Sequence, residues 1–539
     1  MLPVFKWRKY TRVKRIGIST KFHGKSLLRI YGISKKDLNK ELIIREIEIN
    51  GSDGSIENEI WFPINELPEF AFVKIYAKDE VTVSSLEYLF DVDLEEVRIG
   101  CCICTFRREE DVERNLLEIT RGIFNNKESV LHNTLEVFIA DNGKTLSLFE
   151  NEALKEYEDL IHIFPNKNYG GSAGFTRCMI ESAMNDKFGL DYIILMDDDA
   201  TIRSYVLEKT AIFLMTIKPE YREYFVGGAM LFLETPTIQK ENGCYFKNGH
   251  LVMKDYFSDL SVRENILKNE REEKLDYNGW YYCCIPTSVV KKSLLPTPLF
   301  FTWDDAEYGI RNAKGRIITL NGICIWHPAH DAKPGSFRNY YGMRNTCIMR
   351  SEFEPDITFE QIEKVFVRRI ILFMMQFQYN SARYLIMGIR DFYKGIDWYK
   401  AQDAEELNNI VRSSFPDRNL VQLEKSINKY DHGKDMSKKE WLIRMAANTV
   451  CPGKKRIYDI QTPRKSVDYL FANEVEFFNK TTKMGYSFKK DYSEAFSIIC
   501  DYLKLRSAIK KSHDRVWKEW NVRVTELQTI EFWKEYLSI

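Results

Sequence analysis

The sequence predicts an α/β fold in which a mostly parallel, Rossmann-like sheet lies between a β-rich N-terminal module and a mainly helical C-terminal region. Three features lead to this prediction. Short alternating apolar segments fill residues 1–95, strands alternate with helices over residues 96–350, and helical spacing dominates residues 351–539. At 539 residues the chain is too long for one hydrophobic core, so we expect two to four domains.

The N-terminal region, residues 1–95, carries short segments with alternating apolar side chains, among them LLRIYGIS, LIIREIEIN and TVSSLEYLF. The turn-forming stretches NGSDGS and NELPE separate these segments, and convincing helical periodicity is missing. The pattern predicts an antiparallel β-sandwich or jelly-roll module.

The middle region, residues 96–350, has a different rhythm. Strands are predicted at VRIGCCICTF, LEVFIADNG, IHIFPN, DYIILMDDDA and YFVGGAML, with helical spacing in REEDVERNLLEITRGIF and FTRCMIESAMN between them. This alternation indicates a mostly parallel sheet covered on both faces. Ligands of such sheets bind beyond the carboxyl ends of the strands. Conspicuous polar motifs follow the strands (TFRR, ADNGK, NKNYGGSAGF and MDDDA), so we expect them to meet at one site.

The C-terminal region, residues 351–539, is mostly helical in pattern. Its first long stretch, FEQIEKVFVRRIILFMMQFQYNSARYLIMGIRDFYKG, mixes apolar residues with Arg368, Arg369, Arg383 and Arg390. Basic amphipathic helices dock on anionic lipid, so peripheral contact with a membrane is one expectation. An ordinary helix–helix interface is at least as good an explanation.

Composition limits the partners and the compartment. Lysine plus arginine equals aspartate plus glutamate at 78 each, so we expect no nucleic-acid partner. The eleven cysteines are scattered without a zinc spacing, which indicates reduced thiols and a cytoplasmic protein. The basic N-terminus has no apolar signal-peptide core, and no stretch approaches the ~18 apolar residues of a spanning helix. Any membrane contact is therefore expected from the cytoplasmic side.

Three consecutive carboxylates, Asp197, Asp198 and Asp199, end the apolar run DYIILM. They repel one another and are costly to hold near a strand end, so a bound cation is the natural compensation. Oxygen ligands of this kind select Mg²⁺ or Mn²⁺, which usually also take substrate phosphates. The alternative is a solvated turn that caps the following helix, ATIRSYVLEKTAIF.

A second acidic cluster, Asp304, Asp305 and Glu307, stands in FFTWDDAEYGIR where a helix is expected to begin near Ala306. One of these carboxylates would act as a general base and another would bind a substrate hydroxyl. The structural alternative is an N-cap with acids favoured by the helix dipole. The two interpretations are compatible, because a helix N-terminus is a fixed platform for such a group.

Two further motifs contribute a histidine and a flexible loop. His327 follows the apolar strand ICIW and can complete a metal site, although a lone histidine is more often structural and His330 lies close by. NKNYGGSAGFTR places Gly170, Gly171 and Gly174 between a strand and a helix, without the GK[ST] ending of a P-loop. Such a turn would let backbone N–H groups approach a diphosphate.

Together these motifs resemble the inverting glycosyltransferases of family 2, which have a GT-A nucleotide-sugar-binding fold. The resemblance is closest to the mycobacterial-type galactofuranosyltransferases that polymerise galactan. TFRREED is similar to the family's opening TFxR segment, NYGGSAGFTR to its NxGGSGGF loop, and MDDDA to its metal triad. WDDAEYGIR resembles its WDDAE signature, IWHP its metal-binding histidine, and ADNGK its second nucleotide-contacting loop. The match covers about residues 96–350, and the flanking regions more loosely.

The resemblance implies a role for each matching residue. Asp197, Asp199 and His327 would bind the metal ion, and Asp305 would be the catalytic base. Contacts to the nucleotide-sugar donor are implied for Thr105, Arg107, Asp141, Asn142, Gly143, Asn168, Gly170, Gly171 and Asp198.

Acceptor contacts are implied for Trp280, Tyr281, Tyr282, Asp304 and Glu307. The three aromatic residues belong to NGWYYCC, where the family has NGWW-type aromatics beside the acceptor. Tyr281 and Tyr282 thus replace tryptophan, and in RNYYGMRN Gly342 stands where the mycobacterial enzymes carry histidine. Both departures bear on the choice of acceptor and linkage.

The function implied is metal-dependent transfer of galactofuranose from UDP-galactofuranose to a growing cell-surface glycan or lipid-linked glycan, with inversion. Alternatives are a different UDP- or dTDP-hexose donor, a metal-dependent nucleotidyltransferase and a non-catalytic glycan-binding module. WDDAE and the downstream WH disfavour the nucleotidyltransferase, and the presence of all the acids disfavours the non-catalytic module. The N-terminal module would hold an acceptor glycan, support a homo-oligomer or simply pack against the rest.

Overall fold

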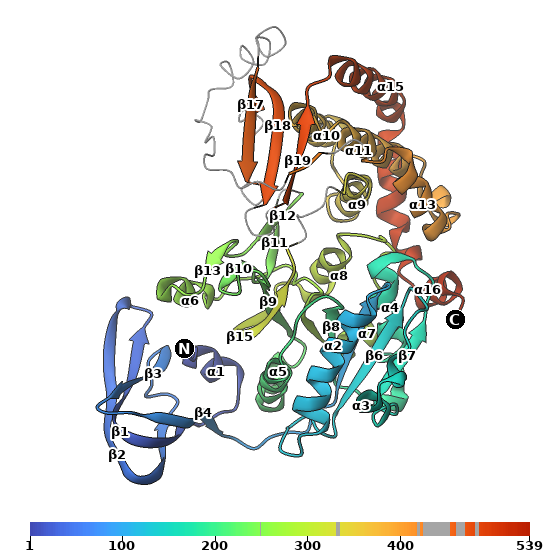
Figure 1. Cartoon of the computed structure of the whole chain (residues 1–539). Coiled ribbons are helices and arrows are strands. Elements are labelled where there is room, and N and C mark those ends of the chain that lie inside the picture. Colours follow the sequence, from blue (N-terminus) through green and yellow to red (C-terminus); the bar gives the residue numbers. More distant parts are fainter. Residues whose placement is uncertain (248, 330–334, 418–420, 424–452, 460–468, 480–483) are drawn as a thin grey trace.

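Figure 1 shows a computed structural model of the protein. It describes residues 1–539 except 248, 330–334, 418–420, 424–452, 460–468 and 480–483, and describes the backbone alone for 51–58, 421–423 and 459. An antiparallel sheet at the N-terminus is followed by a large mixed sheet with helices, and then by a region of helices with a further sheet. Within the described residues no helix is both long and apolar enough to cross a membrane.

The N-terminal sheet is four-stranded and antiparallel. Strands β1 (Arg15–Ser34) and β2 (Asp37–Pro63) form a long hairpin. The second half of β1 also pairs with β3 (Phe70–Ala77), and its first half pairs with β4 (Thr82–Asp91). The β-rich character agrees with the alternating pattern, whereas the expected sandwich or jelly-roll topology stays a prediction.

The predicted turn NGSDGS does not separate two strands but lies within β2. Gly51 pairs with Gly24 and Ile56 pairs with Phe22, so the intervening residues form an irregularity in the ladder. Glycine and aspartate in this stretch therefore mark a bulge, which is the other common use of turn residues in a strand.

A short helix, α1 (Val4–Tyr10), precedes the sheet and was not predicted. Its seven residues are too few to display a helical period. Tertiary contacts explain it, because the indole ring of Trp7 stacks on Phe90 of β4 at 4.2 Å and meets Phe213 edge-on at 5.4 Å. Phe213 belongs to α5 (Ser204–Thr216), so α1 joins the N-terminal sheet to the central one.

The central sheet fits the predicted α/β core. Its strand order is β13-β10-β9-β14-β8-β5-β6-β7, with β15 beside β9. The pairs β5–β6, β5–β8, β6–β7 and β9–β15 are parallel, and β14 is antiparallel to both of its neighbours. The strands are β5 (Ile99–Thr105), β6 (Leu135–Asp141), β7 (Ile161–Pro165), β8 (Tyr192–Asp197), β9 (Phe225–Phe232), β10 (Ile238–Glu241), β13 (Ser258–Asp259), β14 (Cys283–Pro286) and β15 (Ile317–His327).

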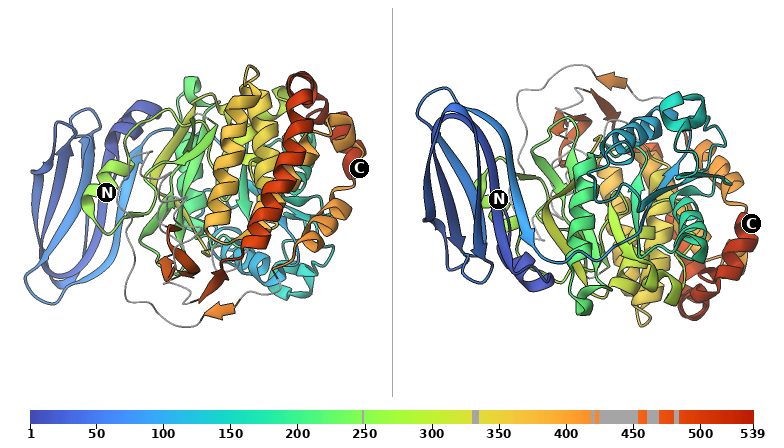
Figure 2. Two further views of the ribbon diagram at one scale, coloured as in Figure 1. Left: turned by 90° about the horizontal axis from the view of Figure 1, so that it is seen from above. Right: turned by 90° about the horizontal axis from the view of Figure 1, so that it is seen from below.

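Helices cover both faces of this sheet (Figure 2). On one face α1, α2 (Glu109–Ile119) and α5 pack against β5 and β6. On the other face α4 (Gly170–Glu181) packs against the same strands, together with the C-terminal helix α16 (Ile530–Leu537). The remaining elements are η1 (Thr120–Phe124), η2 (Leu148–Glu150), α3 (Glu152–Lys155), η3 (Asp186–Phe188), η4 (Pro219–Tyr221), the hairpin β11 (Cys244–Lys247) and β12 (His250–Met253), α6 (Arg263–Asn269), α7 (Thr287–Lys292) and α8 (Asp304–Ala313).

The C-terminal region contains the expected helices and also a four-stranded sheet that was not predicted. The helices are α9 (Arg338–Phe353), α10 (Phe359–Met375), α11 (Tyr379–Phe392), α12 (Ile396–Lys400), α13 (Ala404–Ser414), α15 (Tyr492–Arg523) and the 3₁₀ turn η7 (Val524–Leu527). The sheet consists of β16 (Val421–Leu423), β17 (Lys454–Asp459), β18 (Ala472–Asn479) and β19 (Met484–Lys489). Its strands are short, and the long helical stretches on either side dominate the periodicity of the sequence.

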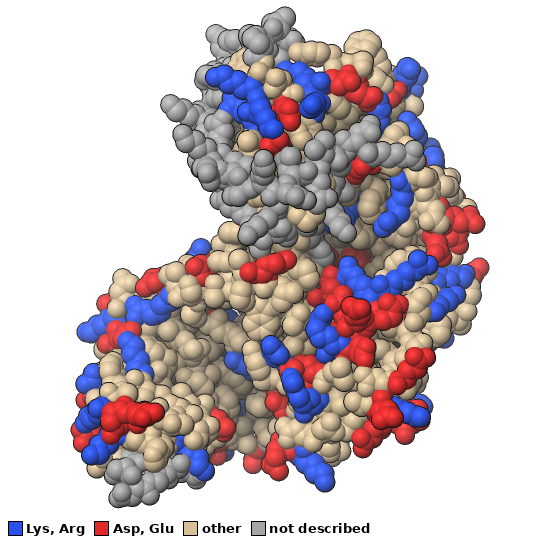
Figure 3. Space-filling model, in the orientation of Figure 1, with Lys and Arg blue, Asp and Glu red and all other residues tan. Residues whose placement is uncertain are grey.

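The surface carries both signs of charge. On the face drawn in Figure 3, lysine and arginine side chains alternate with aspartate and glutamate, as the zero net charge of the chain leads one to expect. The cysteines among the described residues are all free.

Candidate active site

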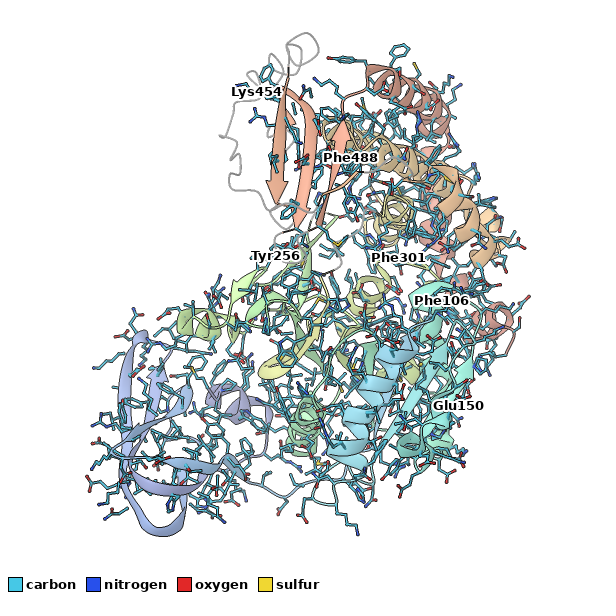
Figure 4. The ribbon with its side chains drawn as sticks, in the orientation of Figure 1. Phe106, Glu150, Tyr256, Phe301, Lys454 and Phe488 are labelled. Atoms are coloured by element: carbon cyan, nitrogen blue, oxygen red, sulfur yellow. The ribbon has the colours of Figure 1, made fainter. Side chains whose placement is uncertain are left out.

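Four strands of the central sheet end at residues that the motifs had singled out. Thr105 ends β5, Asp141 ends β6, Asp197 ends β8 and His327 ends β15. Thr105 lies opposite Asp141 in the register, and Cys104 lies opposite Asp197. Because these strands run in one direction, their carboxyl ends meet at one edge of the sheet, where parallel sheets bind ligands. Phe106, directly after β5, and Phe301, shortly before α8, label this edge in Figure 4.

Asp197, Asp199 and His327 form a compact cluster at this edge. Their nearest ligand atoms all lie within 4.8 Å of one another. Nε2 of His327 lies 2.8 Å from Oδ1 of Asp199 and 3.9 Å from Oδ2 of Asp197. Two carboxylates and an imidazole suit a divalent cation of the Mg²⁺ or Mn²⁺ type, so these residues could hold one. The alternative ligand His330 lies outside the described residues.

The ring of His327 is turned for such a role. Its Nδ1 atom lies 2.8 Å from the carbonyl oxygen of Pro328, so Nδ1–H donates there and Nε2 points to the aspartates. A backbone bridge holds the two loops together, because the N–H of Thr201 donates to the carbonyl of Trp326 at 2.7 Å and the N–H of Trp326 donates back at 3.1 Å. Segments more than a hundred residues apart are thereby fixed side by side.

The crowding of carboxylates changes their protonation. Burial raises the pKa of Asp197 to about 7, with the charges of Asp199 and Asp198 adding to the effect and that of His327 opposing it. Burial lowers the pKa of His327, but the hydrogen bond to Asp199 and the two carboxylate charges outweigh it, so the pKa is raised. The cluster is therefore a place where a positive charge is favoured.

Asp198 faces the opposite way and is held by the elements beside it. Oγ1 of Thr105 donates to Oδ2 of Asp198 at 2.8 Å, and Nη1 of Arg108 lies 3.1 Å from Oδ1. Arg108 also forms an ion pair with Asp199. Asn115 of α2 donates its amide to the carbonyl oxygen of Asp198 at 3.0 Å. Asp198, the middle residue of the three aspartates, thus connects this turn to β5 and α2 by hydrogen bonds.

Sequence reasoning missed Arg108. The resemblance pointed to the preceding residue, Arg107, which is exposed with a left-handed backbone (φ 55°) and a guanidinium 5.2 Å from the ring of Phe106. The consecutive arginines of TFRREED were the available signal, because two adjacent side chains at a strand end point in different directions. The nucleotide contact of Arg107 stays a prediction, whereas Arg108 pairs with two of the three carboxylates, Asp198 and Asp199.

Asp304 and Asp305 begin α8 next to this cluster. Oδ1 of Asp305 accepts a hydrogen bond from the N–H of Ala306 at 2.7 Å. Burial raises the pKa of Asp305 well above its usual range, and the charges of Asp304 and Asp197 add to this shift. Burial likewise raises the pKa of Asp304 to about 6. The charge of Asp197 reaches Asp305, so the two acidic motifs share one site.

The glycine loop completes the same site from α4. Gly170 has φ 83°, and a Cβ atom there would collide with the carbonyl oxygen of Phe300. The N–H of Gly171 donates to that carbonyl at 3.0 Å, and a Cβ on Gly171 would stand 3.5 Å from Oδ2 of Asp304. A Cβ on Gly174 would collide with the thiol of Cys104. The glycines therefore allow α4 to approach both β5 and the acids of α8.

Comparison with known proteins identifies two relatives of this chain. The chain is similar to galactofuranosyltransferase GlfT2 of Mycobacterium tuberculosis, at 23% identity over 442 residues, which cover 77% of this chain and 67% of that protein. GlfT2 of Mycolicibacterium smegmatis is 24% identical over 441 residues, covering 77% of this chain and 65% of that protein. The resemblance inferred from the motifs is confirmed. The chain is a glycosyltransferase.

Other comparisons give weaker likenesses. No protein-family model matches this chain. Among solved structures, the mannosyltransferase PcManGT from Pyrobaculum calidifontis in complex with GDP-Man and Mn²⁺ is 12% identical, with a TM-score of 0.33, and covers 59% of this chain and 81% of that one. S. aureus TarS 1-349 is 10% identical, with a TM-score of 0.31, and covers 60% of this chain and 82% of that one.

In this glycosyltransferase the ADNGK loop is held by its own aspartate. Oδ1 of Asp141 accepts from the N–H groups of Gly143 at 2.9 Å and Lys144 at 2.8 Å, and Oδ2 accepts from two further backbone N–H groups. The amide of Asn142 donates to the carbonyl of Gly170 at 3.1 Å. Asp141 and Asn142 are buried and shape the ADNGK and glycine loops, whereas Asn168 is only partly buried. Donor contacts of these residues stay a prediction.

Glu307 lies on the buried side of α8. Its Oε2 accepts from the N–H of Thr297 at 2.9 Å, and its Oε1 pairs with Nε of Arg311 at 2.6 Å. The side chain is completely buried. This placement contradicts the predicted acceptor contact, because both carboxylate oxygens are occupied by buried partners. Two residues along the helix turn the side chain about 200° from that of Asp305, toward the interior.

The three aromatic residues of NGWYYCC differ in their surroundings. Tyr282 is fully buried with its hydroxyl 2.7 Å from Oγ1 of Thr210, so the structure contradicts an acceptor contact for it. Trp280 is nearly buried against Phe175, with ring centroids 5.3 Å apart. The buried hydroxyl of Tyr281 has no hydrogen-bond partner among the described residues. Tyr281 is therefore the aromatic residue with an unused polar group near Asp305.

Proposed function

We propose that this protein is a metal-dependent inverting glycosyltransferase that transfers galactofuranose from UDP-galactofuranose to a growing cell-surface glycan. One observation carries the proposal. The three candidate metal ligands, Asp197, Asp199 and His327, lie beside Asp305 at the carboxyl edge of the sheet. The similarity to GlfT2 over 77% of the chain supports the choice of donor sugar.

Each group of residues has a separate task in the proposed reaction. Asp197, Asp199 and His327 would hold Mn²⁺ or Mg²⁺, which supplies positive charge opposite the departing diphosphate when bound. Asp305 takes the proton from the acceptor hydroxyl as that oxygen attacks the anomeric carbon, and the configuration there inverts. The raised pKa of Asp305 favours this step, because a more basic carboxylate is the better proton acceptor.

Donor binding falls to the loops around the glycines. Gly170 and Gly171 keep the backbone open at the N-terminus of α4, where N–H groups attract a diphosphate. Arg107 is exposed at the same edge and would meet the nucleotide or its phosphates. On the acceptor side, Asp304 and the unpartnered hydroxyl of Tyr281 are suited to bind sugar hydroxyls.

The setting proposed for the enzyme is the cytoplasmic face of a membrane that carries a lipid-linked glycan acceptor. Two of the four arginines singled out for lipid contact, Arg368 and Arg390, are exposed, whereas Arg383 pairs with Glu494 at 2.7 Å. A homo-oligomer in which the N-terminal sheet takes part remains part of the proposal.

A panel of nucleotide sugars tests the donor and the reaction class together. The purified protein is incubated with Mn²⁺, an oligosaccharide or lipid-linked acceptor and one of UDP-galactofuranose, UDP-galactose, UDP-glucose and dTDP-hexoses, and nucleotide release is measured. We expect UDP release with UDP-galactofuranose, and its loss when EDTA removes the metal.

Other outcomes separate the alternatives. Faster turnover of another nucleotide sugar would replace the donor and leave the reaction class intact. Release of pyrophosphate in place of UDP would indicate a nucleotidyltransferase, and no turnover of any donor would indicate a glycan-binding module. Full activity in EDTA would remove the metal from the proposal.

A further inference from the structure

The segment directly before Asp304, residues 299–303, has an unusual backbone. Phe300 (φ 68°), Thr302 (φ 62°) and Trp303 (φ 75°) all lie in the left-handed region. This region is unfavourable for residues other than glycine, and most of all for bulky ones. Trp303 is also the N-cap of α8 and makes no side-chain capping bond. The local sequence therefore does not stabilise the conformation, and contacts from elsewhere must do so.

One buried amide holds this segment. Nδ2 of Asn345, on α9, donates to the carbonyl oxygens of Leu299 at 3.0 Å, Phe301 at 2.8 Å and Thr302 at 3.1 Å. Asn345 is completely buried. Three carbonyls so close together in sequence can point to one amide only where the backbone reverses its direction. The positive φ angles of this segment make that reversal possible.

The neighbouring arginine orients the amide. Nε of Arg344 donates to Oδ1 of Asn345 at 3.1 Å, and Nη2 of Arg344 donates to the carbonyl of Leu299 at 3.0 Å. The guanidinium lies 5.1 Å from the ring of Tyr341 and 4.9 Å from that of Tyr399. Because Oδ1 is occupied by Arg344, Nδ2 is the end of the amide that faces the segment.

On its other side the 299–303 segment meets the glycine loop. The carbonyl of Phe300 accepts from the N–H of Gly171 at 3.0 Å, and the N–H of Phe300 donates to Oγ of Ser172 at 3.0 Å. The segment therefore lies between α9, the donor loop and the first turn of α8. A shift of the segment would move Asp304 and Asp305, which follow it directly.

We propose that Asn345 is a positioning residue for sugar transfer, which acts through the 299–303 segment to keep the carboxylate of Asp305 in place against the acceptor hydroxyl. The inference rests on the proposed function, in which Asp305 is the base. Asn345 touches neither substrate in this account. Its loss leaves the base present but misplaced, and a misplacement of about 1 Å can cost about 100-fold in rate.

The experiment compares Asn345→Ala with a control on the same helix. In Asn345→Ala we expect kcat to fall about 10- to 100-fold, while the KM for the donor and the affinity for UDP stay within about twofold. The control is Asn339→Ala, also on α9, which removes a side-chain hydrogen bond to the carbonyl of Ser336 (3.1 Å) but does not touch the segment. Its kinetics should match those of the unaltered protein.

A double variant distinguishes positioning from general stabilisation. If Asn345 acts through Asp305, Asn345→Ala causes no further loss of kcat in an Asp305→Asn background. An equal loss in both backgrounds, or an unchanged kcat in Asn345→Ala, overturns the inference. Should Asn345→Ala fail to fold, Ser172→Ala tests the same segment from its other side and should show the same pattern with a smaller loss.

The failure of the proposed function has a different signature. If Asp305→Asn alone turns over normally, Asp305 is not the base, and the proposed mechanism falls irrespective of Asn345. If Asp305→Asn is inactive but Asn345→Ala is as active as its Asn339→Ala control, only the positioning role falls.

Discussion

The carboxylates near the sheet edge differ in how far their oxygen atoms are already engaged in hydrogen bonds and ion pairs. Asp198 is engaged by Thr105 and Arg108, and Glu307 by Thr297 and Arg311. Asp305 accepts the N–H of Ala306 and otherwise sits in a buried, negatively charged neighbourhood that raises its pKa. At the scale of the residue, the acid proposed as base is one whose partners leave a carboxylate oxygen available and whose pKa is raised by burial.

Replacing Asp305 by asparagine tests this assignment. Asn cannot accept the acceptor's proton but keeps the size of the side chain, so we expect kcat to fall about 10²–10⁴-fold. UDP binding, measured by calorimetry with Mn²⁺, should change little. Normal turnover by Asp305→Asn would exclude Asp305 from proton transfer.

The same assignment predicts a pH dependence. The pKa of Asp305 is raised, so its basic form is lost on acidification at a pH above the ordinary range of aspartate. The rate of transfer should therefore rise with pH at pH values above the ordinary titration range of aspartate. This acid limb should be absent from the residual activity of Asp305→Asn, and an identical limb in both proteins would assign it to another group.

At the scale of the element, the site depends on close approaches between backbones. The N-terminus of α4 lies against residue 300, and α4 itself lies against β5, because glycine occupies the contact points. The loop before α4 and the segment before α8 therefore form one unit, held together by the hydrogen bond from the N–H of Gly171 to the carbonyl of Phe300.

Gly170→Ala measures that close approach, with Gly189→Ala as the matched control. Both glycines have positive φ, but nothing lies within 4 Å of a Cβ on Gly189, whereas a Cβ on Gly170 collides with the carbonyl of Phe300. Backbone strain alone costs about 1–2 kcal/mol, so Gly189→Ala should lower the free energy of unfolding by that amount. Gly170→Ala should lower it further and also reduce kcat, as measured by urea unfolding and donor turnover. Equal losses of unfolding free energy in the two variants would show that the backbone near Phe300 moves aside to accommodate the added Cβ at position 170.

At the scale of the whole molecule, the terminal regions support the core from opposite faces. Trp7 of α1 packs on α5, and Trp533 of α16 is buried on the other face with its Nε1–H donating to the carbonyl of Pro296 at 2.8 Å. Gln528 donates to Oγ1 of Thr297 at 2.9 Å. The C-terminus thus fixes the stretch that leads into the 299–303 segment, although it lies more than 200 residues away.

The long helix α15 lies on the outside of the C-terminal region (Figure 2). It also carries exposed apolar side chains. Tyr492, Phe496, Ile499 and Leu503 are 57%, 68%, 44% and 54% exposed and follow one another at helical spacing. We call them the α15 stripe. Exposed apolar residues arranged in this way are typical of a contact surface, and Arg390 on the nearby helix α11 is exposed as well.

Vesicle flotation of the whole protein tests whether the α15 stripe contacts lipid. We expect the protein to float with vesicles that contain anionic lipid and to do so less with neutral ones, because apolar burial and basic side chains act together. Phe496→Ser combined with Leu503→Ser should reduce recovery. The control, Val522→Ser, removes an equally exposed residue (62%) outside the stripe and should leave recovery unchanged. Absence from anionic vesicles would defeat lipid docking and favour a protein partner for the stripe.

Much of the site could be predicted because strand ends are marked by local patterns. An apolar run that stops at a polar motif predicts a strand and its carboxyl end, and parallel pairing then brings Thr105, Asp141, Asp197 and His327 to one edge. The prediction that Asp197, Asp199 and His327 bind the metal ion came from the resemblance to a known family. The elements that were not predicted, α1 and the strands β16–β19, are segments too short to show a clear apolar periodicity.

The sequence by itself determined the order of strands and helices in the core and the chemistry gathered at its edge, because apolar periodicity and strand-end motifs are local properties. Only the tertiary structure decided which carboxylates are engaged and which remain available, that Arg108 pairs with Asp198 and Asp199, and that Asn345 holds the 299–303 segment. Hydrogen bonds between residues distant along the chain leave no local pattern, so their partners appear only when the elements are packed together.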